Sequence, residues 1–298
     1  MSAEPRAALQ VHLFGYRLRV TGPASAVEPL RPLFYTRCQE PAALPPEDLL
    51  EIRAGDGGYA VRRAGEGSGP LLETEDWSEV FWWLDGWFFE KSLEHADSLL
   101  QIHAAAAARE GRAILLVGDS HAGKTSLTLH LILLGFQYLS DETILVDPAT
   151  LQLRPFPRNL MVREGTVRGD ASLERLCRER PECRYGGENP GWFLDPALLG
   201  GGGVAGASAV ERIVCLEKKE SGPPLLEKVG MRAAVEAMVR QQANLRWHGA
   251  AAGVDTMIRL AQLGRNWRLS AVHPGEAWAA LRESLGPARE PGGRGGEG

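Results

Sequence analysis

The fold is decided by residues 113–134, AILLVGDSHAGKTSLTLHLILL, which join an apolar run, a glycine loop and a helical pattern. The five apolar residues 113–117 are typical of a strand buried on both faces. Residues 118–125 then fit the pattern GxxxxGK[ST] without a gap, at the point where the strand ends and a helical period begins. Gly135 follows the helical stretch 126–134, and a glycine in the left-handed backbone conformation commonly ends an α-helix. Together these segments predict an α/β nucleotide-binding domain.

Each part of the loop 118–125, a phosphate-binding loop (P-loop), has a physical role. Its glycines let the backbone turn tightly, so that N–H groups and the dipole of the next helix converge on phosphate oxygens. Lys124 supplies a point charge for the outer phosphates, and Thr125 offers a hydroxyl to Mg²⁺. The His121 side chain is expected to be a spectator, because the loop needs only its backbone N–H. The residues predicted to bind the nucleotide here are Gly118, Asp119, Ser120, His121, Ala122, Gly123, Lys124, Thr125 and Ser126.

A loop that holds Mg²⁺ and a triphosphate needs a carboxylate, to complete the metal shell or to take a proton from an attacking hydroxyl. Two candidates follow the loop helix. Asp147 ends the apolar run 144–146 as in many nucleotide-binding strands, but Pro148 directly after it indicates an ordinary turn. Asp141 and Glu142 are adjacent in the sequence, at the junction between two predicted strands. Two neighbouring acidic residues at such a junction are harder to explain as ordinary solvent-exposed residues than a single Asp in a turn. We therefore favour the Asp141-Glu142 pair.

The residues before the P-loop differ from the loop region in their pattern of apolar, glycine and proline residues. Residues 10–70 hold short apolar runs separated by Gly, Pro and Asp, which is typical of strands and turns, with a hairpin loop at 54–58. Residues 74–100 change to a helical period of aromatic side chains. We interpret this stripe as a packing face that joins two halves of the molecule, in preference to a ligand platform. The expected organisation is a β-rich region over 1–98 ending in an aromatic amphipathic helix, a P-loop domain over 99–286 and a disordered tail over 287–298.

After the loop helix, short hydrophobic periods predict further strands and helices. Strands are expected at 136–139, 143–146, 212–216 and 267–272, and helices at 232–242, 254–263 and 274–284. The glycine-rich stretch 186–206 is expected to be an irregular loop or a linker. The predicted class is therefore α/β.

Composition excludes several classes of function. Of 298 residues, 33 are Lys or Arg and 38 are Asp or Glu, and the net charge of −5 disfavours a dedicated nucleic-acid binder. The amino terminus lacks the pattern of a secretory signal, and no run of about 18 apolar residues could cross a membrane. The four cysteines form no CxxC pair, and we interpret Cys177 and Cys183, six residues apart, as free thiols in preference to a metal or redox pair. A cytoplasmic protein without nucleic-acid or membrane partners is expected.

Three segments together resemble the catalytic domain of HPr kinase/phosphorylase: Ile102-His103, GDSHAGKTS at 118–126 and YLSDE at 138–142. The similarity is greatest to the smaller relatives encoded with ribosomally made peptides, such as those of lasso-peptide biosynthesis. In that family a His lies about fifteen residues before the P-loop, as His103 does here, and an acidic pair follows its hydroxyl residue by sixteen. Asp141 follows Thr125 by that interval. The resemblance covers residues 100–165 well.

This resemblance implies a phosphoenolpyruvate carboxykinase-like P-loop fold with a mixed sheet. It implies that Asp141 is the general base, that Thr125, Asp141 and Glu142 hold Mg²⁺, and that His103 and Lys124 assist at the phosphates of ATP. Arg158 matches a recurrent element of these relatives and is expected to bind the nucleotide. The product would be a phosphoserine or phosphothreonine on a peptide or protein, and a homo-oligomer would be in keeping with the relatives. No convincing copy of the family's carboxy-terminal Arg-bearing signature is found, so whether dephosphorylation also occurs stays open.

Three functions stay open at this point. The first is an ATP- and Mg²⁺-dependent kinase for a Ser or Thr hydroxyl of a peptide or protein, as in the tailoring of a ribosomally made precursor. The second is a kinase for a small-molecule hydroxyl, and the third is a nucleotide-binding regulatory protein without phosphotransfer. The residues do not choose between ATP and GTP. Arg163, close to Arg158 in sequence, is interpreted as solvated surface.

Overall fold

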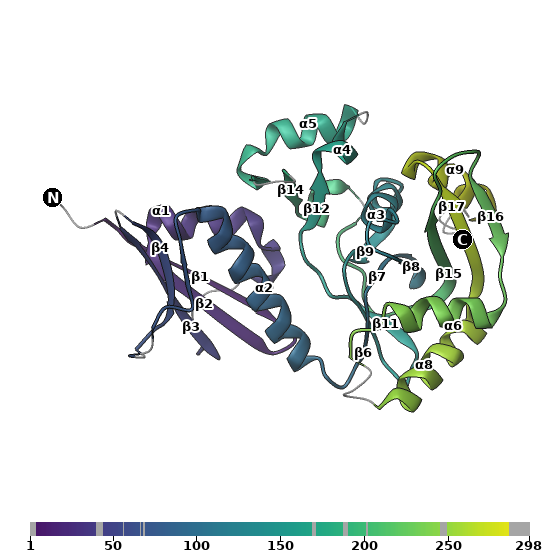
Figure 1. Cartoon of the computed structure of the whole chain (residues 1–298), viewed down its shortest axis with the longest axis horizontal. Helices are drawn as coiled ribbons and strands as arrows, with labels where there is room; N and C mark the ends of the chain where they lie inside the picture. Colours follow the sequence, from purple (N-terminus) through teal and green to yellow (C-terminus); the bar gives the residue numbers. More distant parts are fainter. Residues whose placement is uncertain are drawn as a thin grey trace, which may run out of the picture.

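The computed structural model describes residues 4–285 except 40–43, 56, 66, 68, 169–170, 187–189, 201 and 245–248. Figure 1 shows two β-rich parts joined by a long helix, α2 (Trp77–His95). The predicted disordered tail, 287–298, lies outside the described residues. No helix in the described part of the chain combines the length and the hydropathy needed to cross a membrane. Cys177 and Cys183 are buried free thiols, as predicted, and so are Cys38 and Cys215.

The first sheet alternates buried and partly exposed residues, because only one of its faces is covered. Along β2 the side chains of Tyr16, Leu18 and Val20 are buried while those between them are not. The predicted hairpin loop is confirmed, since Gly55 pairs with Gly58 where two antiparallel strands meet. The sheet order is β1 (Arg6–Leu13), β2 (Tyr16–Pro23), β3 (Asp48–Gly55), β4 (Gly58–Arg63) and β5 (Leu72–Thr74). Short helical turns, α1 (Ala24–Val27), η1 (Glu28–Leu33) and η2 (Thr36–Cys38), connect β2 to β3.

Helix α2 joins the two parts of the molecule, as the aromatic stripe predicts. Asp76 caps its first turn by accepting a hydrogen bond from the Ser78 N–H. Phe81 and its buried neighbours pack against the first sheet. Phe89, from another side of the helix, packs with Phe156 in the second part.

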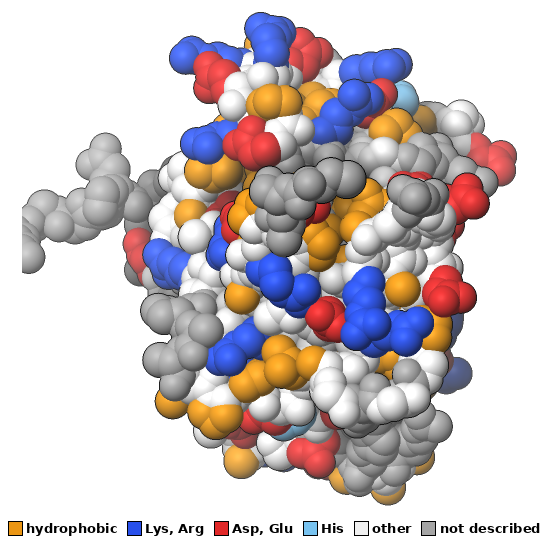
Figure 2. Space-filling model, turned by 90° about the vertical axis from the view of Figure 1, so that its left-hand side faces the viewer, with side chains coloured by type: hydrophobic (Ala, Val, Ile, Leu, Met, Phe, Trp, Pro, Cys, Tyr) orange, Lys and Arg blue, Asp and Glu red, His pale blue; other side chains and the backbone are white. Residues whose placement is uncertain are grey.

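Figure 2, which views the side of the first part, shows small groups of hydrophobic side chains between scattered Lys and Arg.

The second sheet is mixed, which confirms the predicted α/β class with a mixed sheet. β15 (Ser208–Lys218) runs parallel to β8 (Arg112–Gly118) on one edge and to β17 (Arg265–Ala271) on the other. The other pairings are antiparallel: the order is β6 (Leu100–Ile102), β10 (Ile144–Val146), β11 (Gln152–Arg154), β15, β8, β7 (Ala104–Arg109) and β9 (Gln137–Ser140), while β16 (Leu225–Lys228) pairs with β17. Of the predicted strands after the loop, 212–216 lies inside β15, and 136–139, 143–146 and 267–272 overlap β9, β10 and β17 and extend one residue beyond them.

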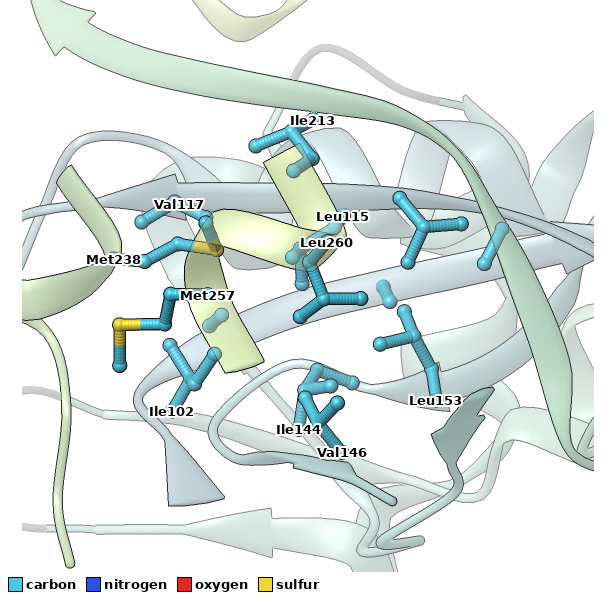
Figure 3. Close-up of a cluster of buried hydrophobic side chains, with 14 of the residues drawn as sticks. Ile102, Leu115, Val117, Ile144, Val146, Leu153, Ile213, Met238, Met257 and Leu260 are labelled. Carbon is cyan, nitrogen blue, oxygen red and sulfur yellow. The ribbon is translucent and has the colours of Figure 1, made fainter. Parts of the chain in front are cut away.

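Helices cover both faces of this sheet, which is why its central strands read as continuous apolar runs. Alternate residues of β8 face opposite ways, so that Leu115 belongs to one core and Leu116 to the other. The first core is covered by α6 (Met231–Arg240) and α8 (Ala250–Leu263), whose Met238, Met257 and Leu260 meet the strands in Figure 3. The second is covered by α3 (Lys124–Leu133) and α9 (Pro274–Leu285). The predicted helices 126–134, 232–242, 254–263 and 274–284 match α3, α6, α8 and α9 to within a few residues.

A small sheet interrupts the second part between β11 and β15. Its order is β12 (Leu160–Arg163), β14 (Gly191–Leu194) and β13 (Arg184–Tyr185), accompanied by α4 (Glu164–Val167), α5 (Ala171–Glu179) and η3 (Pro181–Cys183); η4 (Pro196–Leu199) follows it. The expectation of an irregular stretch at 186–206 is wrong where β14 forms. Gly191 suggests a loop, but a Cβ there would collide with the Val162 carbonyl, so the glycine permits close strand pairing.

The side chains of Tyr185 and Phe193, from this small sheet, complete the core of the first sheet. Residues 1–98 therefore do not close their own core. The boundary at residues 98 and 99 stays a prediction.

Candidate nucleotide-binding and phosphotransfer site

The P-loop follows the carboxyl end of β8 and leads into α3. Gly118 lies opposite Leu216 of β15, and a Cβ on it would sit 2.6 Å from the Leu216 carbonyl oxygen. No larger residue fits there without a backbone shift, so this glycine fixes how closely the loop approaches the sheet. The loop then turns through His121, whose φ of 66° is in the left-handed region, and α3 begins at Lys124. The amino end of the helix is thus directed toward the loop.

A cavity of about 370 Å³ lies against this loop. Four segments surround it: the residue after β6, the P-loop, the turn between β9 and β10, and β12 with α4. Its lining residues are His103, Ser120, His121, Gly123, Lys124, Thr125, Ser126, Asp141, Glu142, Met161, Arg163 and Thr166. The structure therefore brings most of the predicted site residues together. Gly118, Asp119 and Ala122 belong to the same loop but are not among those lining residues.

Asp141 is buried, lines this cavity and is held by Tyr138. The Tyr138 hydroxyl donates to Asp141 Oδ1 at 2.7 Å and accepts the Asp141 backbone N–H at 3.1 Å. Burial raises the pKa of Asp141 to about 6, against the opposing effects of the Tyr138 and Thr125 hydroxyls. Burial and the neighbouring carboxylate also raise the pKa of Tyr138, which keeps that hydroxyl a donor. Asp141 is therefore a fixed carboxylate that is more basic than an exposed one.

His103 and Glu142 lie next to each other at the cavity wall. His103 Nδ1 is 3.5 Å from Glu142 Oε1. Burial and the positive charge of Lys124 lower the pKa of His103, although Glu142 opposes this. The imidazole is therefore mainly neutral at pH 7 and can orient the Glu142 carboxylate by a hydrogen bond.

Lys124 holds a buried positive charge at the centre of the loop. Its ammonium donates to the carbonyl oxygens of Gly118, at 2.8 Å, and Asp119, at 3.2 Å. Burial lowers the pKa of Lys124, while the carboxylates of Glu142, Asp119 and Asp141 oppose that shift. The cavity thus brings the cations Lys124 and Arg163 together with the carboxylates of Asp141 and Glu142, an arrangement suited to phosphate bridged to a metal ion.

The structure separates the two acidic candidates. Asp147 lies outside the cavity lining, and its Oδ1 accepts the N–H groups of Ala149 and Thr150 in a turn. This is the ordinary strand-ending turn that Pro148 indicates. Asp141 and Glu142 line the cavity.

Two arginines are placed differently from their predicted positions. Arg158, expected at the nucleotide, is absent from the described cavity lining; it pairs with Asp85 of α2 and stacks on Phe89 at 4.5 Å. The charge of Arg158 still acts on Glu142 and Asp141, and its expected role at the nucleotide stays a prediction. Arg163, expected at the solvated surface, lines the cavity, and its Nη1 lies 3.1 Å from His121 Nδ1. His121 therefore has a side-chain contact at the cavity, which its expected spectator role does not include.

Sequence reasoning missed three residues at or beside this cavity. Met161 and Thr166 line it from the small sheet and α4, and the Thr166 hydroxyl is 3.3 Å from that of Ser126. Gln241 donates from Nε2 to Asp119 Oδ1 at 2.7 Å, and its carbonyl accepts the His103 N–H at 2.7 Å. No local pattern marks Gln241, because its partner Asp119 is 122 residues away in the chain.

The residues present fit Mg²⁺ carried by a nucleotide better than a metal bound by protein alone. No group of three or more His, Cys, Asp or Glu that could hold a metal ion is found in the described part of the chain. Thr125, Asp141 and Glu142 nevertheless place hard oxygen donors on one cavity. Mg²⁺ usually binds through one or two carboxylates together with phosphate oxygens. Asp141 and Glu142 supply the carboxylates here, and a bound nucleotide would supply the phosphate oxygens.

Replacing Gly118 by alanine is expected to disturb the loop. The added Cβ would meet the Leu216 carbonyl at 2.6 Å, so we expect a loss of about 1–3 kcal/mol in unfolding free energy and weaker nucleotide binding. Gly206→Ala is the matched control, because no atom lies within 4 Å of the position that its new Cβ would take. Denaturant unfolding and ATP titration of both variants test this, and equal behaviour of the two would contradict it.

Comparison with known proteins gives a partial likeness. No family model matches the chain, and no curated protein matches it. Among solved structures, the HPr(Ser) kinase/phosphatase from Coxiella burnetii is similar at 16% identity and a TM-score of 0.31, over 62% of this chain and 95% of that one. The fold and the cavity described above rest on this chain's own strand order and side chains.

Proposed function

We propose that this protein is an ATP- and Mg²⁺-dependent kinase that transfers the γ-phosphate to a Ser or Thr hydroxyl of a peptide or protein. The observation that carries the proposal is the position of Asp141. This buried carboxylate, fixed by Tyr138, lines the same cavity as Lys124 and Thr125 of the P-loop. A phosphate-binding loop that faces a positioned base is the arrangement that phosphoryl transfer to a hydroxyl needs.

Asp141 would take the proton from the acceptor hydroxyl. Tyr138 holds the carboxylate through Oδ1, so little reorientation is needed when the proton arrives. A pKa of about 6 leaves Asp141 mostly ionised at pH 7, yet makes it a stronger base than an exposed aspartate. Lys124 would offset the negative charge that gathers on the transferred group.

Bound Mg²⁺ and ATP would supply the phosphoryl group and neutralise its charge. The metal would be held by the hydroxyl of Thr125 and the carboxylates of Asp141 and Glu142, with His103 orienting Glu142 from 3.5 Å. The P-loop backbone would hold the phosphates. Gln241 would hold the P-loop and the backbone at His103 close together, because it forms hydrogen bonds to both.

The acceptor side of the cavity supports a peptide or protein substrate. Met161, Arg163 and Thr166 contribute an apolar, a cationic and a hydroxyl side chain to the cavity beside the P-loop. These are groups that can contact an extended polypeptide beside the reacting hydroxyl. The resemblance to kinases encoded with ribosomally made peptides adds that the substrate would be a precursor peptide in the cytoplasm.

Incubation with Mg²⁺ and γ-labelled ATP, against a panel of Ser- and Thr-containing peptides and a panel of small alcohols, tests this proposal. Label on a peptide supports it and begins to define the acceptor. Label on small alcohols alone would favour a small-molecule kinase. Tight ATP binding without transfer to either panel would favour a nucleotide-binding regulatory protein.

A further inference from the structure

A second cavity, of about 160 Å³, lies on the other side of the P-loop from the first. His121, Gly123 and Ser126 line both cavities, so the two meet across the loop. The opposite wall of the second cavity comes from the ends of β15 and β17 and from α9. Figure 1 shows these elements together at the side of the molecule away from the first sheet.

The second cavity lies where the strand topology favours ligand binding. β8, β15 and β17 are mutually parallel, and Leu216 of β15 pairs with both Gly118 and Leu269. Their carboxyl ends therefore lie at one edge of the sheet. The crevice outside the carboxyl ends of parallel strands is the usual ligand site of such sheets.

The distribution of charged groups orients a nucleotide between the cavities. Lys124, Asp141 and Glu142 line the first cavity and are absent from the described lining of the second. Because the lysine of a P-loop reaches the β- and γ-phosphates, the reacting end of the triphosphate belongs in the first cavity. The other end of the nucleotide would then pass Ser126, at the start of α3, and enter the second cavity.

We propose that the second cavity binds the nucleoside half of the nucleoside triphosphate. Apolar side chains of Leu216, Leu269, Val272 and Ala277 form part of its lining, together with polar groups that include Glu217, and can cover the faces of an aromatic base. Lys218 and His273 also line it and can contact polar atoms of the base or the sugar. This assignment rests on the proposed kinase function and adds which residues distinguish a nucleotide from bare polyphosphate.

Filling the second cavity tests the assignment by binding alone. We expect Val272→Trp to raise the Kd of Mg²⁺-ATP about tenfold or more, a loss of about 1.4 kcal/mol, and to leave the Kd of tripolyphosphate unchanged within about twofold. Leu225→Trp is the control, because Leu225 is exposed on neighbouring β16 and outside the described cavity lining. Calorimetric titration of both ligands against both variants and the unmodified protein gives the comparison.

Unchanged ATP binding in Val272→Trp, or equal weakening of ATP and tripolyphosphate, would overturn the nucleoside assignment and leave the proposed kinase function standing. If the unmodified protein bound neither ligand, both proposals would fail together. Photolabelling of the unmodified protein with 8-azido-ATP needs no variant to fold. We expect the label in peptides that contain residues 216–218 or 271–277, whereas labelling confined to 161–166 would place the base in the first cavity and overturn the assignment.

Discussion

The substitution Asp141→Asn is expected to lower the rate of phosphoryl transfer by about 10²–10⁴-fold and to affect ATP binding much less, because Thr125 and Glu142 would still hold the metal. An amide of the same shape can still accept the Tyr138 hydroxyl, so the local packing survives. It cannot take a proton from the acceptor hydroxyl. Single-turnover transfer of label, together with ATP titration, measures the two effects separately.

The matched control is Asp147→Asn. Asp147 is the same residue type, six positions further along, and its carboxylate accepts two backbone N–H groups in a turn outside the cavity. Transfer should be unchanged in this variant. Transfer near the normal rate in Asp141→Asn would show that Asp141 is not the base.

The substitution Asp85→Ala is expected to cost about 3–5 kcal/mol in unfolding free energy. Asp85, in the middle of α2, pairs with Arg158, and the two side chains are only 11% and 22% exposed. Burial raises the pKa of Asp85 and the Arg158 charge opposes that shift, so the carboxylate depends on its partner. Removing Asp85 leaves a guanidinium without its partner between the two parts of the molecule. The midpoint and slope of urea unfolding measure the loss.

Glu94→Ala is the control on the same helix. Glu94 pairs with Lys91 one turn away, but both side chains are considerably more exposed than those of the buried pair. We expect this change to cost no more than about 1 kcal/mol. The double variant Asp85→Leu with Arg158→Met should recover most of the loss, because it removes both charges. Equal unfolding midpoints for Asp85→Ala and Glu94→Ala would refute a structural role for the buried pair.

The parts of the site that the sequence predicts are those built from local segments. The loop 118–125 forms between a strand and a helix because its glycines, apolar run and helical period all act within about twenty residues. The choice of Asp141 over Asp147 follows in the same way, since a proline after Asp147 marks a turn. In the structure Asp141 lines the cavity and Asp147 does not. The catalytic roles of these residues stay predictions until the variants above are measured.

The parts that could not be predicted are contacts between distant segments. Arg158 and Arg163 lie five residues apart on one short stretch, yet Arg158 turns to Asp85, 73 residues earlier, and Arg163 turns to the cavity. A sequence pattern shows that an arginine is present but not which buried carboxylate is near enough to pair with it. Gln241 and Met161 carry no pattern of their own for the same reason.

The P-loop, its flanking strand and helix, the nearby acidic pair and the α/β class can be predicted from the amino-acid sequence, because backbone propensity and hydrophobic period act over short stretches, whereas the mixed sheet was expected only from the family resemblance. The tertiary structure alone decided what surrounds that loop. Parallel pairing of β8, β15 and β17 places a second cavity beside it, and the small sheet brings Met161 and Arg163 to the first. These arrangements depend on packing between segments far apart in the chain, and side-chain burial and charge pairing are settled only when those segments meet.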